Sequence, residues 1–236
     1  MRAIVFHGLC SKKLAFSLLL VLAAGLFPVT GAWSQCARND PFDDSSFAAF
    51  WTAQDINASG GSQTEGTSLT VTAYAGTIGN NADSFRYVYQ QVTGDFIVTL
   101  QINSIPAWGR CGLMARNDLT AGSVHAWVGA NGSGAFGFRY RPTTGDNTST
   151  TSAGTHNNPC YVRLARNGSE VLGYYSNDNS NWTLFGATTL SNLANSCYIG
   201  IAVIAGENAY RTASVNHFNM TRGDCTLTPT PSSTPT

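Results

Sequence analysis

Residues 86–116 read RYVYQQVTGDFIVTLQINSIPAWGRCGLMAR, and this stretch decides the fold class. In its middle, every second residue is apolar: Phe96, Val98, Leu100 and Ile102. A period of two is typical of a β-strand that buries one face, and no helix would bring these four side chains together. Gly94-Asp95 is a turn signal before this strand, and Pro106 with Gly109 breaks the chain after it. The stretch therefore predicts three consecutive strands.

The same pattern recurs along the chain. A first strand is expected near Phe47, Phe50 and Trp51. Further short strands are predicted at 66–74, 123–130, 135–141, 160–166, 170–176, 182–185, 198–204 and 211–220. Gly, Asn and Ser turns separate them, and no window has the length and periodicity of a helix. The sequence thus predicts an all-β, antiparallel two-sheet β-sandwich, with a long polar loop from Pro142 to Pro159.

The two ends of the chain differ in composition from its middle. Arg2, Lys12 and Lys13 precede an apolar run of 14 residues at 14–27, which predicts a secretory signal peptide over residues 1–34. A retained membrane anchor is the alternative interpretation. Residues 226–236 are rich in Pro, Thr and Ser, as in linkers or tails, and a further module could follow. The predicted domain is therefore residues 35–225 of a secreted, extracellular or cell-surface protein.

Charge argues against two classes of partner. The chain has 13 basic and 13 acidic residues, and three of the basic ones lie in the predicted signal peptide. The remainder has 13 − 3 = 10 arginines against 13 acids, a net charge of −3. Such a chain has no electrostatic affinity for nucleic acid or for an anionic membrane.

Cysteine usage fits an oxidising compartment. Five cysteines remain after the predicted signal peptide: Cys36, Cys111, Cys160, Cys197 and Cys225. Cys36 and Cys225 bracket the domain and could form a disulfide bond, while Cys160 and Cys197 could form another if their strands are neighbours. Cys111 lies within an apolar strand and is predicted to be a buried free thiol.

The order of segments resembles a known family. The segments GDF, GLMAR, RLARNG and YSNDNSNW occur in the order found in laminin-G-like domains of the concanavalin A-like lectin/glucanase superfamily. This resemblance covers roughly residues 41–221 and implies a jelly-roll sandwich whose concave face or rim loops often bind glycans. One departure concerns the turn after Ser176, where Asn179 replaces the usual glycine. Asn tolerates the left-handed conformation, so the turn is expected to form.

The sequence offers little for catalysis. The related glucanases use two acids on one strand, whereas Glu65, Glu170 and Glu207 are isolated in turn-like contexts. An acid pair drawn from two strands stays open as an alternative. No cofactor is expected, although calcium at a loop rim is common in laminin-G-like domains. Three aspartates could supply its oxygen ligands: Asp43, Asp44 and Asp224.

A polar strand face predicts the binding site. If the apolar sets face the core, the opposite face carries Arg116, His125, Trp127, Arg139 and Arg163, with Trp108 at the rim. A tryptophan beside guanidinium and imidazole donors suits a sugar, because the ring stacks on C–H faces while the donors bind hydroxyl or carboxylate groups. The equally weighted alternative is a solvated face on which arginines pair with acids and Trp127 packs under the long loop.

The sequence therefore predicts a non-catalytic, carbohydrate-binding domain whose partner is an extracellular glycan. A glycoside hydrolase and a structural or adhesive extracellular subunit are the alternatives.

Overall fold

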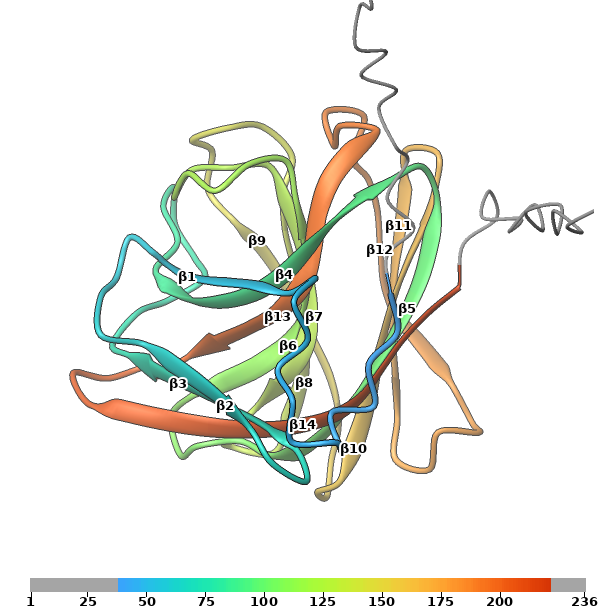
Figure 1. The fold of residues 1–236 in the computed structure, drawn as a ribbon. Helices are drawn as coiled ribbons and strands as arrows, with labels where there is room; N and C mark the ends of the chain where they lie inside the picture. The colour runs from blue at the N-terminus through green and yellow to red at the C-terminus, as the bar shows by residue number, and fades with distance from the viewer. Residues whose placement is uncertain (1–37, 222–236) are drawn as a thin grey trace, which may run out of the picture. The chain divides into compact units, whose positions relative to one another are not determined.

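The computed structural model describes residues 38–221, which form fourteen β-strands in two sheets (Figure 1). The first sheet has the order β1 (Thr52–Ile56), β4 (Phe85–Thr93), β13 (Ser196–Ile204), β6 (Arg110–Arg116), β7 (His125–Asn131), β8 (Ala135–Arg141) and β9 (Ser149–Thr155). The second sheet has the order β12 (Thr183–Thr189), β11 (Glu170–Ser176), β10 (Cys160–Asn167), β5 (Phe96–Ser104), β14 (Tyr210–Thr221), β3 (Leu69–Tyr74) and β2 (Ser62–Glu65).

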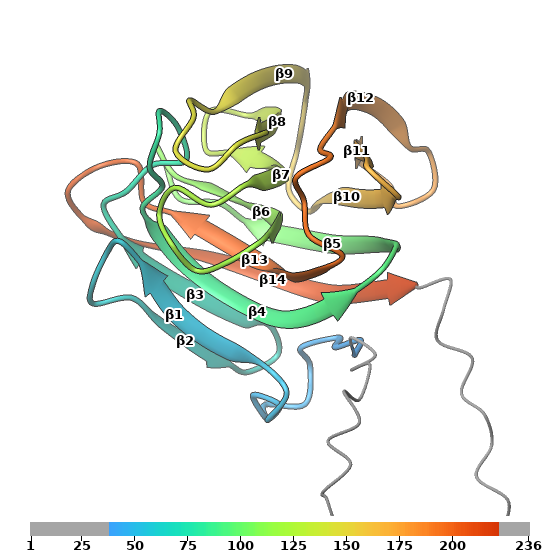
Figure 2. The same ribbon diagram turned by 90° about the horizontal axis from the view of Figure 1, so that it is seen from above.

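All strand pairs are antiparallel, and the two sheets pack face to face as a sandwich (Figure 2). The predicted fold class is confirmed. The three strands of residues 86–116 are also confirmed, as β4, β5 and β6. They alternate between the sheets, because β5 belongs to the second sheet and its two sequence neighbours belong to the first.

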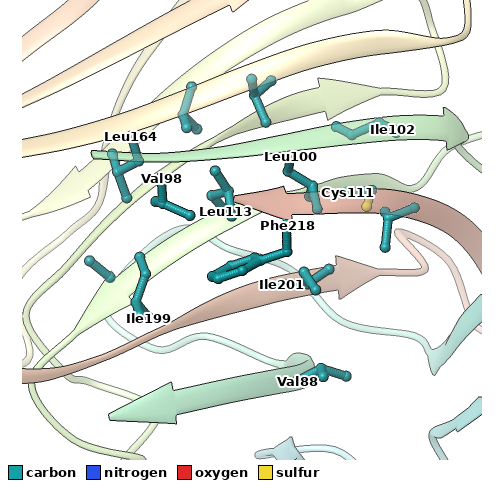
Figure 3. Packing of buried hydrophobic residues seen from close by; sticks show 14 of the residues in the cluster. Val88, Val98, Leu100, Ile102, Cys111, Leu113, Leu164, Ile199, Ile201 and Phe218 are labelled. Carbon is teal, nitrogen blue, oxygen red and sulfur yellow. The ribbon is translucent and has the colours of Figure 1, made fainter. Parts of the chain in front are cut away.

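The interior of the sandwich is filled by the alternating apolar residues of both sheets. Val98, Leu100 and Ile102 of β5 are fully buried and face Leu113 of β6 and Ile201 of β13 across the interior (Figure 3). Burial of apolar surface is the main stabilising term in such a fold, at about 25 cal/mol per Å². The period of two therefore decides which face of each strand points inward.

The main differences from the sequence-based prediction are two additional strands and the start of the first strand; several other strands differ from their predicted bounds by a few residues. The first strand begins at Thr52, just after the predicted anchors, of which Trp51 is buried in the core. β2 and β9 were not predicted, and β9 lies inside the segment expected to be a loop. Both are edge strands with mostly polar or small, exposed residues, so they lack the apolar alternation that reveals the other strands.

The turn after Ser176 forms as predicted. Asn179 has a φ of 58°, in the left-handed region. Asp178 Oδ1 accepts hydrogen bonds from Ser180 N at 2.8 Å and Asn181 N at 2.7 Å, which satisfies the turn. The departure from glycine is thus accommodated by asparagine and its aspartate neighbour.

The cysteine predictions have mixed outcomes. Cys111 is a buried free thiol, as predicted, and burial raises its pKa well above the ordinary value. The predicted bond between Cys160 and Cys197 is wrong, because Cys160 lies on β10 of the second sheet as a free thiol and Cys197 lies on β13 of the first sheet. Burial raises the pKa of Cys160 to about 12.

Several predictions concern residues outside 38–221. The signal peptide, the tail, and the pairing of Cys36 with Cys225 all fall beyond the described part of the chain, so they remain predictions. Within residues 38–221, no helix has the length and hydropathy needed to span a membrane.

Candidate functional site

The site lies on the outer face of the first sheet, the face that points away from the interior. Strand register places Arg116 beside His125 and His125 beside Arg141 across β6, β7 and β8. The next row on this face contains Met114, Trp127 and Arg139. The prediction that Arg116, His125, Trp127 and Arg139 share one face is therefore confirmed.

Arg163 does not belong to this face. It lies on β10 of the second sheet, with its guanidinium carbon 3.8 Å from the centre of the Trp182 ring. A period of two places a side chain on one face of its own strand, but it does not say which sheet contains that strand. The predicted alignment of Arg163 with the other residues is thus wrong.

The part of the outer face around Trp127 is covered by the chain itself. Ile78, in the connection between β3 and β4, is fully buried and packs in a second apolar cluster with Tyr87, Met114 and Trp127. Trp127 is 1% exposed. It was expected to offer an open stacking surface for a sugar, and its burial contradicts that expectation. The connection that covers it carries no alternating pattern from which its position could be predicted.

A row of glycines explains how Trp127 fits. Gly112, Gly129 and Gly137 are register partners on the same face. A Cβ atom at Gly129 would lie 2.3 Å from Trp127 Cζ2, and one at Gly137 would lie 3.3 Å from Cζ3. The indole ring therefore lies against backbone that has no side chains to hold it away.

One end of this face is a closed cluster, formed by Asp83, Arg116, His125 and Arg141, all 0% exposed. Arg141 binds Asp83 with two hydrogen bonds, Nη2 to Oδ1 at 2.7 Å and Nη1 to Oδ2 at 2.9 Å. Arg116 Nη2 lies 3.8 Å and His125 Nδ1 lies 3.3 Å from Asp83 Oδ2. A buried carboxylate with several charged or donating neighbours is a structural ion-pair network.

The titration of the closed cluster follows from burial and charge. Burial alone would raise the pKa of Asp83, but hydrogen bonds and charge from His125 and Arg141 outweigh it, so the pKa lies below its ordinary value. Burial lowers the pKa of His125, and Asp83 offsets this only in part. At neutral pH, Asp83 is therefore ionised and His125 is neutral.

Three connecting loops complete the closed cluster. Asp83 N donates to Ala121 O at 2.9 Å, Gly145 N to Gly122 O at 2.9 Å, and Thr148 N to Asn80 O at 2.8 Å. The loops after β3, β6 and β8 thus bind one another, as seen at the upper left of Figure 1. Arg116 and Arg141 also donate hydrogen bonds to backbone carbonyl groups of these loops. Arg141 Nε, for example, donates to Asp146 O at 2.8 Å.

The other end of the face is open. A small cleft with a cavity volume of about 10 Å³ is lined by Arg110, Trp127, Asn131, Ala135, Gly137, Arg139 and Ser152, and it is called the open cleft below. This volume is close to what a single water molecule needs and far below the roughly 300–1,000 Å³ of sites that enclose a drug-sized ligand. The open cleft therefore has room for one small substituent of a ligand and not for a whole sugar unit.

Within residues 38–221, the two arginines of the open cleft have no acidic partner. The ion pairs between described residues involve neither Arg110 nor Arg139. Arg139 Nη1 donates to Ile78 O at 2.8 Å, whereas its Nε is buried without a hydrogen bond in the described structure. Burial, and then the charge of Arg110, lowers the pKa of Arg139 to about 10, and burial lowers that of Arg110.

Trp108 lies next to the open cleft along the chain and is 70% exposed. It has a φ of 67°, unusual for a bulky residue, and its loop is fixed by hydrogen bonds from Gly109 N to Pro106 O and from Gly132 N to Gly109 O, both 3.0 Å. Gly132 directly follows Asn131, a lining residue. Of the two tryptophans predicted for binding, Trp108 is thus the accessible one.

A second cleft, of about 300 Å³, lies on the outer face of the second sheet. Its lining is mostly polar: Thr99, Leu100, Gln101, Tyr161, Asn179, His217 and Asn219. Trp182 and Arg163 are on this side of the sandwich. This cleft is the competing location for a ligand.

Only two of the three aspartates considered for calcium lie in the described part of the chain, so that prediction stays untested. Asp43 and Asp44 are exposed, and Asp44 Oδ1 accepts a hydrogen bond from Ser46 N at 2.9 Å, a turn contact. Asp224 lies outside the described residues. Among residues 38–221, no three His, Cys, Asp or Glu side chains come together as a metal site.

No family model matches the sequence, and no curated protein matches it either. Solved structures match the fold. A functionally unknown protein from Saccharomyces cerevisiae has a TM-score of 0.58 at 13% identity, over 73% of this chain and 96% of that one. A xylan β-1,4-xylosidase from Bacillus halodurans has 0.58 at 12% identity, over 79% of this chain and 39% of that one. A Bacillus subtilis protein of unknown function with a galectin-like fold has a TM-score of 0.52 at 12% identity, over 78% of this chain and 94% of that one.

These matches define the class of fold, a two-sheet β-sandwich of galectin-like and concanavalin A-like type. The chain spans about two fifths of the length of the xylosidase and of related GH43 chains. These matches show the β-sandwich fold and do not specifically show a laminin-G relationship.

Two residues of the site are not singled out by the sequence. Arg110 shares its strand face with Met114 and Arg116 by the period of two, so a signal for it exists in RCGLMAR. Asp83 lies in a connection and is 58 residues from Arg141, so no local pattern reveals its role.

Proposed function

We propose that this domain binds carbohydrate without transforming it, at the open cleft and the adjacent Trp108. The observation that carries the proposal is Trp108, a tryptophan that is 70% exposed and held in a left-handed conformation beside a cleft lined by hydrogen-bond donors. An exposed indole offers a flat apolar surface on which a sugar ring can stack, and residues in sparsely populated backbone conformations cluster at binding sites.

The fold class supports this proposal. Structures of similar fold include a xylan β-1,4-xylosidase and a protein with a galectin-like fold. As a secreted domain, this chain would meet its glycan outside the cell.

A hydrolase is the less favoured function. A retaining or inverting glycosidase needs two carboxyl groups about 5–10 Å apart in one cleft. Asp83 is an acid on this face, and it is 0% exposed and bound by Arg141. The lining of the open cleft contains no acidic residue.

The proposal is tested by a glycan-array screen of the full chain with two matched variants. Trp108→Ala removes the exposed ring at the open cleft, and Trp182→Ala removes a ring on the other sheet. We expect Trp108→Ala to weaken binding about tenfold or more, a loss of about 1.4 kcal/mol, and Trp182→Ala to leave it unchanged.

The contrary results are distinct. Loss of binding in Trp182→Ala alone would move the site to the cleft of the second sheet. Binding to no glycan would favour a structural or adhesive subunit. Release of reducing ends from a bound polysaccharide would show a hydrolase.

A further inference from the structure

The open cleft holds two positive charges that nothing in the described structure neutralises. Arg110 and Arg139 both line it, and neither forms an ion pair with a described carboxylate. Both side chains are partly buried. Partly buried charges of one sign are costly, because burial removes water and the two charges repel each other.

The two arginines at the other end of the same face have a carboxylate counter-ion. Arg141 has both oxygens of Asp83 within 2.9 Å, and Arg116 lies 3.8 Å from the same carboxylate. The described part of the chain therefore supplies a counter-ion at one end of the face and none at the other.

We propose that Arg110 and Arg139 bind the oxyanion of an acidic saccharide, a carboxylate or a sulfate ester, in the open cleft. This inference rests on the proposed function and adds the class of glycan. A guanidinium group offers a planar pair of N–H donors that matches a carboxylate or sulfate, and such bonds are about twice as strong as neutral ones.

The rest of the cleft fits this ligand. Arg139 is held in place by its bond to Ile78 O at 2.8 Å, so the charge is positioned before the ligand arrives. Ser152, exposed on β9, offers a hydroxyl group. Arg110 is two residues from Trp108, so the oxyanion would bind near a ring on which the sugar can stack. A neutral sugar would leave both charges without a partner.

The experiment is biolayer interferometry of the full chain on four immobilised polymers. Polygalacturonate and its methyl ester differ in the carboxylate charge, and dextran sulfate and dextran differ in the sulfate. We expect tighter binding to at least one charged polymer than to its neutral match, and weakening as salt is raised. The charged polymer that is preferred identifies the source of the oxyanion.

Variants locate the site. Arg110→Met and Arg139→Met should each weaken binding to the charged polymer about tenfold or more, since each removes a hydrogen bond to a charged group. Arg163→Met is the matched control on the second sheet and should change affinity less than about twofold. Arg110→Lys keeps the charge without the planar fork and should recover part of the affinity. Near-ultraviolet circular dichroism establishes that each variant is folded.

Three results would overturn the inference. Equal binding to charged and neutral polymers would contradict the proposed recognition of an oxyanion but not the proposed carbohydrate binding. A charge preference that survives in both Arg110→Met and Arg139→Met would place the anion elsewhere. Binding to none of the four polymers, together with an empty glycan array, would overturn the proposed function and the inference with it.

Discussion

Four arginines lie on one face of two strands and have opposite environments. Arg116 of β6 and Arg141 of β8 share the carboxylate of Asp83, whereas Arg110 of β6 and Arg139 of β8 have no described ion-pair partner. Residue type and strand face are therefore insufficient to assign a role. The counter-ion decides whether an arginine fixes the fold or is available to a ligand.

The energetic consequence differs between the two ends. A buried ion pair contributes little net stability, but removing one partner is strongly destabilising because it leaves the other charge buried without compensation. An arginine without a partner costs the fold its desolvation energy in the free protein, and a ligand can recover that cost on binding. The closed cluster should thus be sensitive to mutation in stability, and the open cleft in affinity.

The largest expected effect comes from removing the shared counter-ion. Asp83→Ala leaves Arg116 and Arg141 buried without a carboxylate, and we expect the free energy of unfolding to fall by about 3–5 kcal/mol. Urea denaturation measures this change. Asp146→Ala, at an exposed aspartate of the same loop cluster, is the control and should change stability by less than about 0.5 kcal/mol. If Asp83→Ala lowered the free energy of unfolding by less than about 1 kcal/mol, the closed cluster would not be a stabilising element that differs from the open cleft.

The next effect concerns the residue between the two ends. Ile78 is fully buried against Trp127 and Met114, so Ile78→Ala should lower the free energy of unfolding by about 2–5 kcal/mol through lost contacts and a cavity. Leu184→Ala, on the exposed edge strand β12, is the control, with an expected change of less than about 0.5 kcal/mol. An Ile78→Ala variant as stable as this control would mean that the segment does not hold Trp127 in place.

Much of the fold follows from the sequence, for a physical reason. β8 and β11 have the predicted bounds because both alternate between core-facing apolar residues and outward-facing ones. β9 reads STTSAGT and is almost wholly exposed, so burial left no pattern in its sequence. Edge strands are held mainly by backbone hydrogen bonds, which do not constrain side-chain type.

The site is less predictable than the strands that carry it. Period two places Trp127 and Arg139 on one face correctly, but burial of that face depends on Ile78, far away in the sequence. The pairing of Arg141 with Asp83 likewise depends on how a loop folds over the sheet. These are tertiary contacts between segments with no shared local pattern.

A smaller effect is the pH dependence of stability, which is expected from the closed cluster and not from the open cleft. The pKa of His125 lies below 6.5 in the folded protein, so below that pH the unfolded chain binds a proton that the folded one does not. Stability should therefore fall as pH decreases from 6.5, by about 1.4 kcal/mol for each unit of depression. A further loss is expected below pH 3.8, because the pKa of Asp83 is lowered and its ionised form is the one stabilised. The open cleft has no group that titrates in this range.

Glu65 acts in the opposite direction and must be removed first. Burial, together with Asp40 and Asp44, raises its pKa from 4.5 to about 7, so its contribution to stability rises as pH decreases from 7 to 4.5. The measurement is therefore urea denaturation of Glu65→Gln at pH 7.5, 5.5 and 4.5, beside Glu65→Gln/His125→Asn. Equal pH dependence in both would show that His125 titrates normally.

The smallest expected change in stability is the sharpest comparison, because it uses two arginines of one strand. Arg110→Met removes a partly buried charge that has no described partner, so the free energy of unfolding should stay the same or rise by up to about 1 kcal/mol. Arg116→Met removes one of the two arginines near Asp83, which keeps Arg141, and leaves the carbonyl groups of Asp118 and Thr120 without their side-chain donors. The free energy of unfolding should therefore fall by more than about 2 kcal/mol. Urea denaturation at low ionic strength measures both. If Arg110→Met loses as much as Arg116→Met, then Arg110 holds the fold together, and the open cleft is an extension of the closed cluster. If Arg116→Met lowers the free energy of unfolding and Arg110→Met does not, the charge of Arg110 does not stabilise the ligand-free protein. Binding of a ligand then explains why an arginine lies at the cleft.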